Sequence, residues 1–153
     1  MSALSALTIA EARRALRAGE IGAIELTEIC LAAAEGAGAL NAVSALTPER
    51  ARYQASLAAG RLKDGEAPGL CGIPLGIKDL FCVEDAPAQA ASRILEGFRP
   101  PYESTVTRKL WEAGAVCVGK LNMDEFAMGS STETSAYGPA VNPWRRRGDA
   151  ARD

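Results

Sequence analysis

Histidine is absent from this sequence of 153 residues. Without it, the chain cannot by itself supply a Ser–His–Asp or Cys–His catalytic pair, nor a histidine-bearing zinc site. Its four cysteines are scattered with no Cys-x-x-Cys pair, which predicts buried thiols in a reducing compartment and no metal site. Acid–base chemistry in this chain must therefore use a lysine, a carboxylate or a tyrosine.

Long apolar runs and an excess of positive charge are also lacking. No run approaches the roughly 20 residues that span a bilayer, and the first residues show no signal-peptide pattern. The formal net charge of -2 disfavours a broad basic surface for nucleic acid. With 48% hydrophobic and 24% charged residues, the composition is typical of a globular protein, for which we expect a cytoplasmic location and no membrane partner.

Residues 1–60 are expected to form an N-terminal helical segment. Thr8 and Glu11 match a capping box, and Gly19 offers a left-handed stop after an apolar stripe that begins at Ile9. A second helix is predicted over residues 24–35, with Ile24 buried. The Thr47-Pro48 pair opens a third, because proline at the first helical position gives up only a donor that the helix cannot use.

Residues 61–144 read as the start of an α/β domain. The apolar runs at 73–78 and 115–118 predict buried strands, a helix is expected over 104–113 with Val106 on its apolar face, and Asn122 with Glu125 should cap another short helix. Strands that alternate with helices favour a parallel sheet. Residues 145–153 (RRRGDAARD) form an irregular charged tail, for which a frayed terminus and a truncation point are both open.

One glycine pattern imitates a phosphate-binding loop. Residues 114–120 (GAVCVGK) match GxxxxGK, but their interior is strand-like, and Leu121 follows where a Ser or Thr would bind magnesium. We expect no phosphate site there.

Lys78 is the first candidate for chemistry, at the end of GIPLGIKD. Alternation along a strand puts Lys78 on the same face as Gly76, whereas Asp79 points away and is a poor ion-pair partner. The open space expected beside Gly76 would desolvate the lysine and lower its pKa, as a lysine base requires. The alternative is a lysine that extends into solvent at the strand end.

Met128, Gly129 and Ser130 form the second candidate, inside NMDEFAMGSSTE. Such a turn of small and hydroxylated residues can present N–H and OH groups to a polar ligand. A plain Ser/Thr capping loop is the alternative.

Taken in order, GIPLGIKDL, RPPYESTV, EAGAVCVGKLNMDEFAMGSSTETSAYGP and VNPW resemble the amidase-signature family, and in particular its tRNA-dependent amidotransferase branch. The resemblance runs from the N-terminal helices to Trp144. It implies a large mixed sheet covered by helices, about three times longer than this chain, of which this chain is the incomplete N-terminal part.

The resemblance also implies a Ser–cis-Ser–Lys triad, in which Lys78 matches the lysine and Met128, Gly129 and Ser130 match a loop of the substrate pocket. The bridging and nucleophilic serines belong to a later segment resembling GGSSGGS, which these residues lack, so we expect the chain alone to be inactive. Residues 82–91 (CVEDAPAQAA) depart from the glycine and threonines that are usual in the family.

For the complete protein, the resemblance implies a glutaminase that works with subunits B and C. Its ammonia would convert Glu-tRNA(Gln) to Gln-tRNA(Gln), with no cofactor in this chain and with ATP, magnesium and most of the tRNA held by the B subunit. A stand-alone amidase for another small amide and a non-catalytic remnant that at most binds partner subunits are the alternatives.

Overall fold

The computed structural model describes residues 7–144, so the tail predicted for residues 145–153 lies outside the described residues. In chain order, the elements are α1 (Ile9–Ala18), α2 (Ala23–Gly36), β1 (Val43–Leu46), α3 (Pro48–Lys63), β2 (Pro74–Lys78), α4 (Thr105–Glu112) and β3 (Val116–Leu121). Short 3-10 turns cover Gly38–Leu40, Arg93–Leu95 and Glu125–Ala127. Among these residues, no helix is long and apolar enough to cross a membrane.

The strands form one mixed sheet in the order β1-β3-β2. The predicted parallel pairing of β2 with β3 is confirmed, while β1 joins β3 antiparallel. One expectation was wrong in part: residues 1–60 are not all helical, because they contain β1. The four residues of β1 carry too weak a local signal, and their strand state depends on partners such as Leu121, far along the chain.

The helix signals read from the sequence are largely confirmed. Thr8 and Glu11 form the capping box, and Gly19 ends α1 in the left-handed conformation with a φ of 69°. Pro48 begins α3, and the Ser104 hydroxyl caps α4 by accepting a hydrogen bond from the Thr107 amide.

The predicted burial of several helix residues was wrong. Ile9, Ile24 and Val106 are exposed. The buried residues of α2 are Ala23, Leu26, Thr27 and Leu31. In α2 the apolar residues occupy most of the helix circumference, so periodicity alone does not identify the face that packs.

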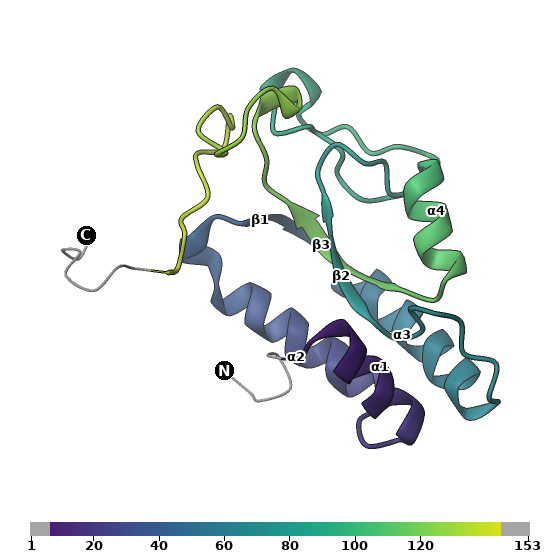
Figure 1. The fold of residues 1–153 in the computed structure, drawn as a ribbon. Coiled ribbons are helices and arrows are strands. Elements are labelled where there is room, and N and C mark those ends of the chain that lie inside the picture. Colours follow the sequence, from purple (N-terminus) through teal and green to yellow (C-terminus); the bar gives the residue numbers. More distant parts are fainter. Residues whose placement is uncertain (1–6, 145–153) are drawn as a thin grey trace.

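Helices cover both faces of the sheet, with α2 and α3 on one side and α4 on the other (Figure 1). Val116 and Val118 of β3 pack with Leu31 of α2 and with Ala51 and Ala55 of α3. On the opposite face, the buried Ile77 and Cys117 contact Leu110 and Trp111 of α4. Because β2 and β3 are parallel, their carboxyl ends lie side by side. We call this end of the sheet the carboxyl edge.

Candidate active site at the carboxyl edge of the sheet

Lys78 is the last residue of β2 and lies opposite Leu121, the last residue of β3. Its side chain is exposed in this structure, so the prediction of a buried lysine was wrong for residues 7–144. Gly76 does not leave a cavity beside it either, because a Cβ at Gly76 would lie 2.7 Å from Leu121 Cδ2. The glycine accommodates a leucine from the neighbouring strand.

The buried lysine of this edge is Lys120, one residue before the end of β3, with an exposed fraction of 0%. Its ammonium donates hydrogen bonds to the carbonyl oxygens of Phe81 at 2.9 Å, Pro87 at 2.7 Å and Asp79 at 3.3 Å. The same nitrogen lies 3.6 Å from Asp79 Oδ1. Burial lowers the pKa of Lys120, and the Asp79 carboxylate opposes this effect. In the sequence, Lys120 stands out only as the last residue of the GxxxxGK pattern, for which no phosphate site is expected.

Asp79 faces Lys120 and not the neighbouring Lys78, as alternation along the strand predicted. Its second carboxylate oxygen accepts hydrogen bonds from the amides of Gln89 at 3.3 Å and Ala91 at 3.1 Å. Its own amide donates to the Leu121 carbonyl at 3.0 Å. Asp79 thereby ties the loop that follows Lys78 to the end of β3.

The loop of residues 79–92 has an unusual backbone. Ala90 and Ala91 both have positive φ, 48° and 50°, a conformation that is uncommon for residues with a side chain. Hydrogen bonds from the Phe126 amide to Ala90 and from the Ala136 amide to Ala91, each 3.0 Å, hold these two residues. The segment that departs from the usual family pattern is therefore firmly built into the structure.

Asp124 organises the other loop of this edge. Its carboxylate accepts hydrogen bonds from the amides of Ser131 at 3.1 Å, Thr132 at 2.9 Å and Thr134 at 3.2 Å, and from the Thr134 hydroxyl at 3.0 Å. The amide of Thr132 contributes most to lowering the pKa of Asp124, while desolvation opposes it. The short helix predicted after Asn122 is only a single 3-10 turn at residues 125–127, and no side chain caps it.

Met128, Gly129 and Ser130 stand in this Asp124-held loop, all exposed. A Cβ at Gly129 would overlap the Asp124 carboxylate, which explains the glycine. Met128 is 79% exposed. The parallel pairing of β2 and β3 brings Lys78 and this loop to the same edge of the sheet, the edge at which α/β proteins usually bind ligands.

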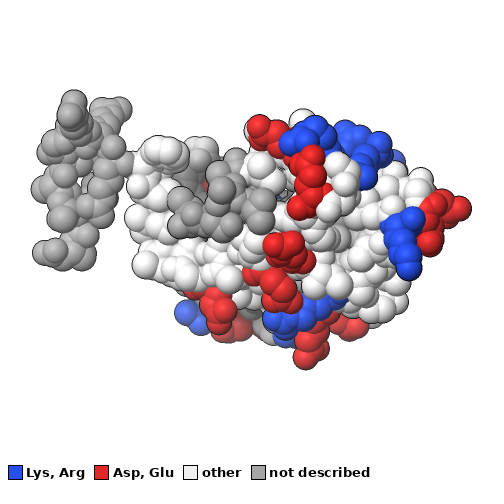
Figure 2. Space-filling model, turned by 90° about the horizontal axis from the view of Figure 1, so that it is seen from below, with Lys and Arg blue, Asp and Glu red and all other residues white. Residues whose placement is uncertain are grey.

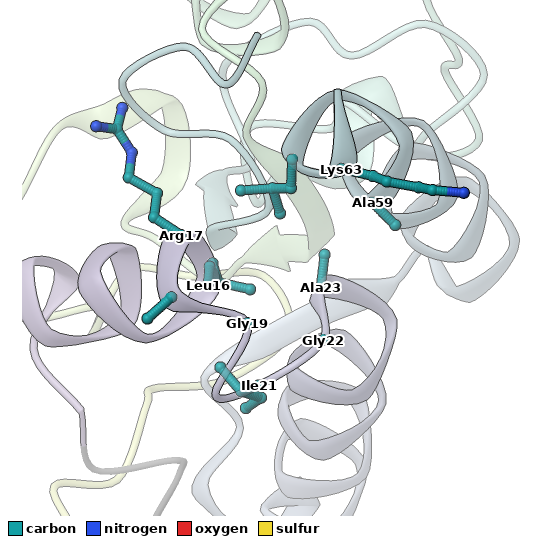
Figure 3. A pocket seen from close by; sticks show the side chains of 10 residues that line it. Leu16, Arg17, Gly19, Ile21, Gly22, Ala23, Ala59 and Lys63 are labelled. Carbon is teal, nitrogen blue, oxygen red and sulfur yellow. The ribbon is translucent and has the colours of Figure 1, made fainter. Parts of the chain in front are cut away.

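A cavity lies elsewhere, between the end of α1, the start of α2 and the end of α3. It measures about 360 Å³ and is lined by residues that include Leu16, Gly19, Ala23 and Ala59. Arg17 and Lys63 extend away from it (Figure 3). Within residues 7–144, no group of three His, Cys, Asp or Glu side chains could hold a metal ion.

A family model described as Amidase matches residues 25–150. The chain belongs to the amidase family.

Curated relatives and solved structures agree with this family. The A subunit of glutamyl-tRNA(Gln) amidotransferase from Dinoroseobacter shibae is 68% identical over 95% of this amidase chain and 30% of its own length. The protein of that name from Ruegeria pomeroyi is 64% identical over 99% of the chain and 31% of its own length. The chain thus spans about 30% of the length of the curated relatives it matches.

Among solved structures, the native peptide amidase of Stenotrophomonas maltophilia superposes with a TM-score of 0.79 at 31% identity, over 94% of this chain and 31% of its own. A member of a vestigial complex related to the origins of an s-triazine catabolic enzyme gives a TM-score of 0.84 at 36% identity, over 90% and 31%. The α/β fold is therefore part of an amidase-signature fold.

Proposed function

We propose that residues 7–144 are the part of a glutaminase subunit that contributes the catalytic lysine. The complete polypeptide would hydrolyse glutamine and supply ammonia for converting Glu-tRNA(Gln) to Gln-tRNA(Gln). The observation that carries this proposal is the 68% identity to the A subunit of a glutamyl-tRNA(Gln) amidotransferase. Because the chain spans 30% of that relative, the activity, substrates and partners belong to the proposal.

Lys78 is assigned the role of base. A neutral Lys78 amine would accept the proton of a bridging serine, which in turn takes the proton of the nucleophilic serine as it attacks the glutamine amide. The proton would return through the bridging serine to the leaving nitrogen, which departs as ammonia, and water would then release glutamate from the acyl-enzyme. A lysine must be neutral for this role, and desolvation favours the neutral form. Since Lys78 is exposed in residues 7–144, further parts of an amidase domain would have to cover it.

Met128, Gly129 and Ser130 are assigned to the wall of the glutamine pocket. Their loop is preorganised, because the Asp124 carboxylate holds three of its amides before any substrate binds. The loop also lies at the same edge as Lys78.

The partners in this proposal are amidotransferase subunits B and C in the cytoplasm. ATP and magnesium, with most of the tRNA contacts, are assigned to the B subunit. The net charge of -2 agrees with this division. The GxxxxGK pattern agrees with it as well, because most of the pattern is strand β3 and not a loop.

The second candidate is a stand-alone amidase for another small amide, favoured by the peptide amidase superposition. Copurification of the complete protein with subunits B and C distinguishes the two candidates. Binding of both subunits supports the amidotransferase, and binding of neither supports the stand-alone amidase. In either case we expect residues 1–153 alone to show no glutaminase activity. Loss of the nucleophile from a coupled catalytic set costs on the order of 10⁶ in turnover.

A chimera tests the assignment of Lys78. Residues 7–144 would replace the matching part of the Dinoroseobacter shibae relative, and ammonia release from glutamine would be measured with the B and C subunits of that organism. We expect activity in the chimera and its loss on Lys78→Ala, with Lys63→Ala on α3 as the matched control. Full activity in the Lys78→Ala chimera would refute the role of this lysine.

A further inference from the structure

One ion pair of the chain is shielded from water. The charged side chains visible in Figure 2 are interspersed over the surface, and pairs such as Arg14–Glu20 are exposed, so that water and salt weaken them. Lys120 and Asp79 form the only ion pair of residues 7–144 whose two side chains are both fully buried. Burying two charges has a large desolvation cost, so the contacts of this pair should explain it.

The hydrogen bonds of the Lys120 ammonium go to the backbone and not to its ionic partner. A lysine ammonium has three N–H donors, and the carbonyl oxygens of Asp79, Phe81 and Pro87 accept them. Asp79 Oδ1 lies 3.6 Å from the nitrogen and is left without a hydrogen-bond donor. The carboxylate therefore compensates the charge, whereas the ammonium holds three backbone carbonyls. An apolar side chain could fill this space without the desolvation cost, but it could not bind the carbonyls.

Two of these carbonyls belong to the turn that follows β2. The turn begins at Lys78 and is closed by a hydrogen bond of 3.0 Å from the Phe81 amide to the Lys78 carbonyl. Its second residue, Asp79, donates its amide to the Leu121 carbonyl of β3 at 3.0 Å. Lys78 is thus the first residue of a turn whose second and fourth residues are bound to Lys120. Any shift of this turn would therefore move Lys78.

Lys120 acts on Lys78 only through this backbone. Lys78 pairs with Leu121, the neighbour of Lys120, and successive residues of a strand face opposite sides of the sheet. The two ammonium groups therefore do not meet. On its other side, Lys120 is one residue from the end of β3, after which the chain enters the loop held by Asp124. Lys120 consequently connects the turn of the candidate base with the strand that leads into the candidate pocket loop.

We propose that Lys120 is a positioning residue, which fixes Lys78 relative to the loop of Met128, Gly129 and Ser130 by holding the turn that begins at Lys78. This inference rests on the proposed function, in which Lys78 is the base. Lys120 itself touches neither glutamine nor a reacting atom. A base must lie within hydrogen-bond reach of the proton that it accepts, and a displacement of about 1 Å can cost about 100-fold in rate.

The chimera with the Dinoroseobacter shibae relative, assembled with the B and C subunits of that organism, tests the proposal. The main variant is Lys120→Met combined with Asp79→Asn, because it removes the ammonium without leaving a buried carboxylate unpaired. We expect kcat for ammonia release from glutamine to fall by about 100-fold. KM should stay within about threefold of its original value, because Lys120 does not contact the substrate.

A second variant tests whether binding of the carbonyls is the decisive property. Lys120→Gln, again combined with Asp79→Asn, has a neutral amide that can donate two hydrogen bonds. We expect its kcat to exceed that of the methionine variant by about tenfold. Equal kcat values in the two variants would overturn the proposal. Should the methionine variant fail to assemble, an unchanged kcat in the glutamine variant would overturn it as well.

Leu31→Ala is the control for a general loss of stability. Leu31 packs against Val116 on the other face of the sheet, and its truncation leaves a cavity in that core. The assembled variant should keep the original kcat. Circular dichroism and light scattering would verify the fold and assembly of every variant. A methionine variant whose kcat matches this control, or whose loss appears in KM alone, would contradict the positioning role.

Lys78→Ala in the same chimera separates the failure of this inference from the failure of the proposed function. Activity that is lost with Lys78→Ala but complete in both Lys120 variants leaves the role of Lys78 standing and overturns the role of Lys120. Activity that survives Lys78→Ala overturns both.

Discussion

Lys78 and Lys120 lie near the carboxyl ends of two neighbouring parallel strands, yet their surroundings are opposite. Lys78 extends into solvent, whereas Lys120 is fully buried and donates to three carbonyl oxygens. The difference follows from the side of the sheet that each side chain faces. Lys120 meets the loop of residues 79–92, and Lys78 meets no such cover within residues 7–144. The lysine that stabilises the fold and the lysine assigned to catalysis are therefore different residues.

Lys120→Met should separate the two lysines most sharply. It leaves the Asp79 carboxylate buried without its cation, at a cost of about 3–5 kcal/mol of unfolding free energy. Lys78→Met, the control, should change stability by less than about 0.5 kcal/mol. Urea denaturation measures both. The double variant Lys120→Met with Asp79→Asn should recover part of the loss, and no recovery would contradict an ionic role for this pair.

The glycines near the two lysines give a second contrast. A Cβ at Gly119 would lie 2.6 Å from the carbonyl oxygen of Ala45, whereas one at Gly76 meets a leucine side chain that can rotate. We expect Gly119→Ala to cost about 2–3 kcal/mol and Gly76→Ala about 1 kcal/mol or less. Thermal unfolding of the two variants would show the order, and a larger loss for Gly76→Ala would contradict the close approach of β1 and β3.

The loop held by Asp124 should respond to acid. Because hydrogen bonds lower the pKa of Asp124 in the folded state, its contribution to stability is present above the unfolded pKa of about 3.9. That contribution is lost as the pH falls through the lower folded value. An NMR titration of the Asp124 carboxyl carbon should show a midpoint below about 3.9. The amide shifts of Ser131 and Thr132 should follow it and stay unchanged over this range in Asp124→Asn.

Lys78→Ala should have the smallest effect in this chain. We expect neither a measurable loss of stability, since the side chain is exposed, nor a change in ammonia release, which should equal the blank before and after substitution. A coupled glutamate assay would check this. Release above the blank that disappears with Lys78→Ala would mean that residues 1–153 hold a complete site.

Much of the fold was predictable from local signals. The capping box at Thr8, the stop at Gly19 and the proline of α3 act within a few residues of the chain, so the sequence identifies them directly. β1 was missed because its four residues become a strand only through pairing with β3. Ile24 was misplaced because α2 is apolar around most of its circumference.

The candidate site shows the same division. The motifs around Lys78 and Met128 to Ser130 were recognisable, and alternation in β2 predicted that Lys78 and Asp79 face apart. The burial of Lys120 could not be predicted, because the carbonyl groups that compensate for its desolvation belong to residues 33 to 41 positions away. Nor could the role of Asp124 be seen, since hydrogen bonds to later loop amides define it.

The amino-acid sequence by itself determined the family, the main helices and the parallel pair of strands, because motif order, capping and apolar periodicity are local properties. Only the tertiary structure decided which lysine is buried, which carboxylates hold the loops and which strand lies between the other two. Those outcomes depend on contacts between distant segments, where desolvation of a charge is offset only once its partners are in place.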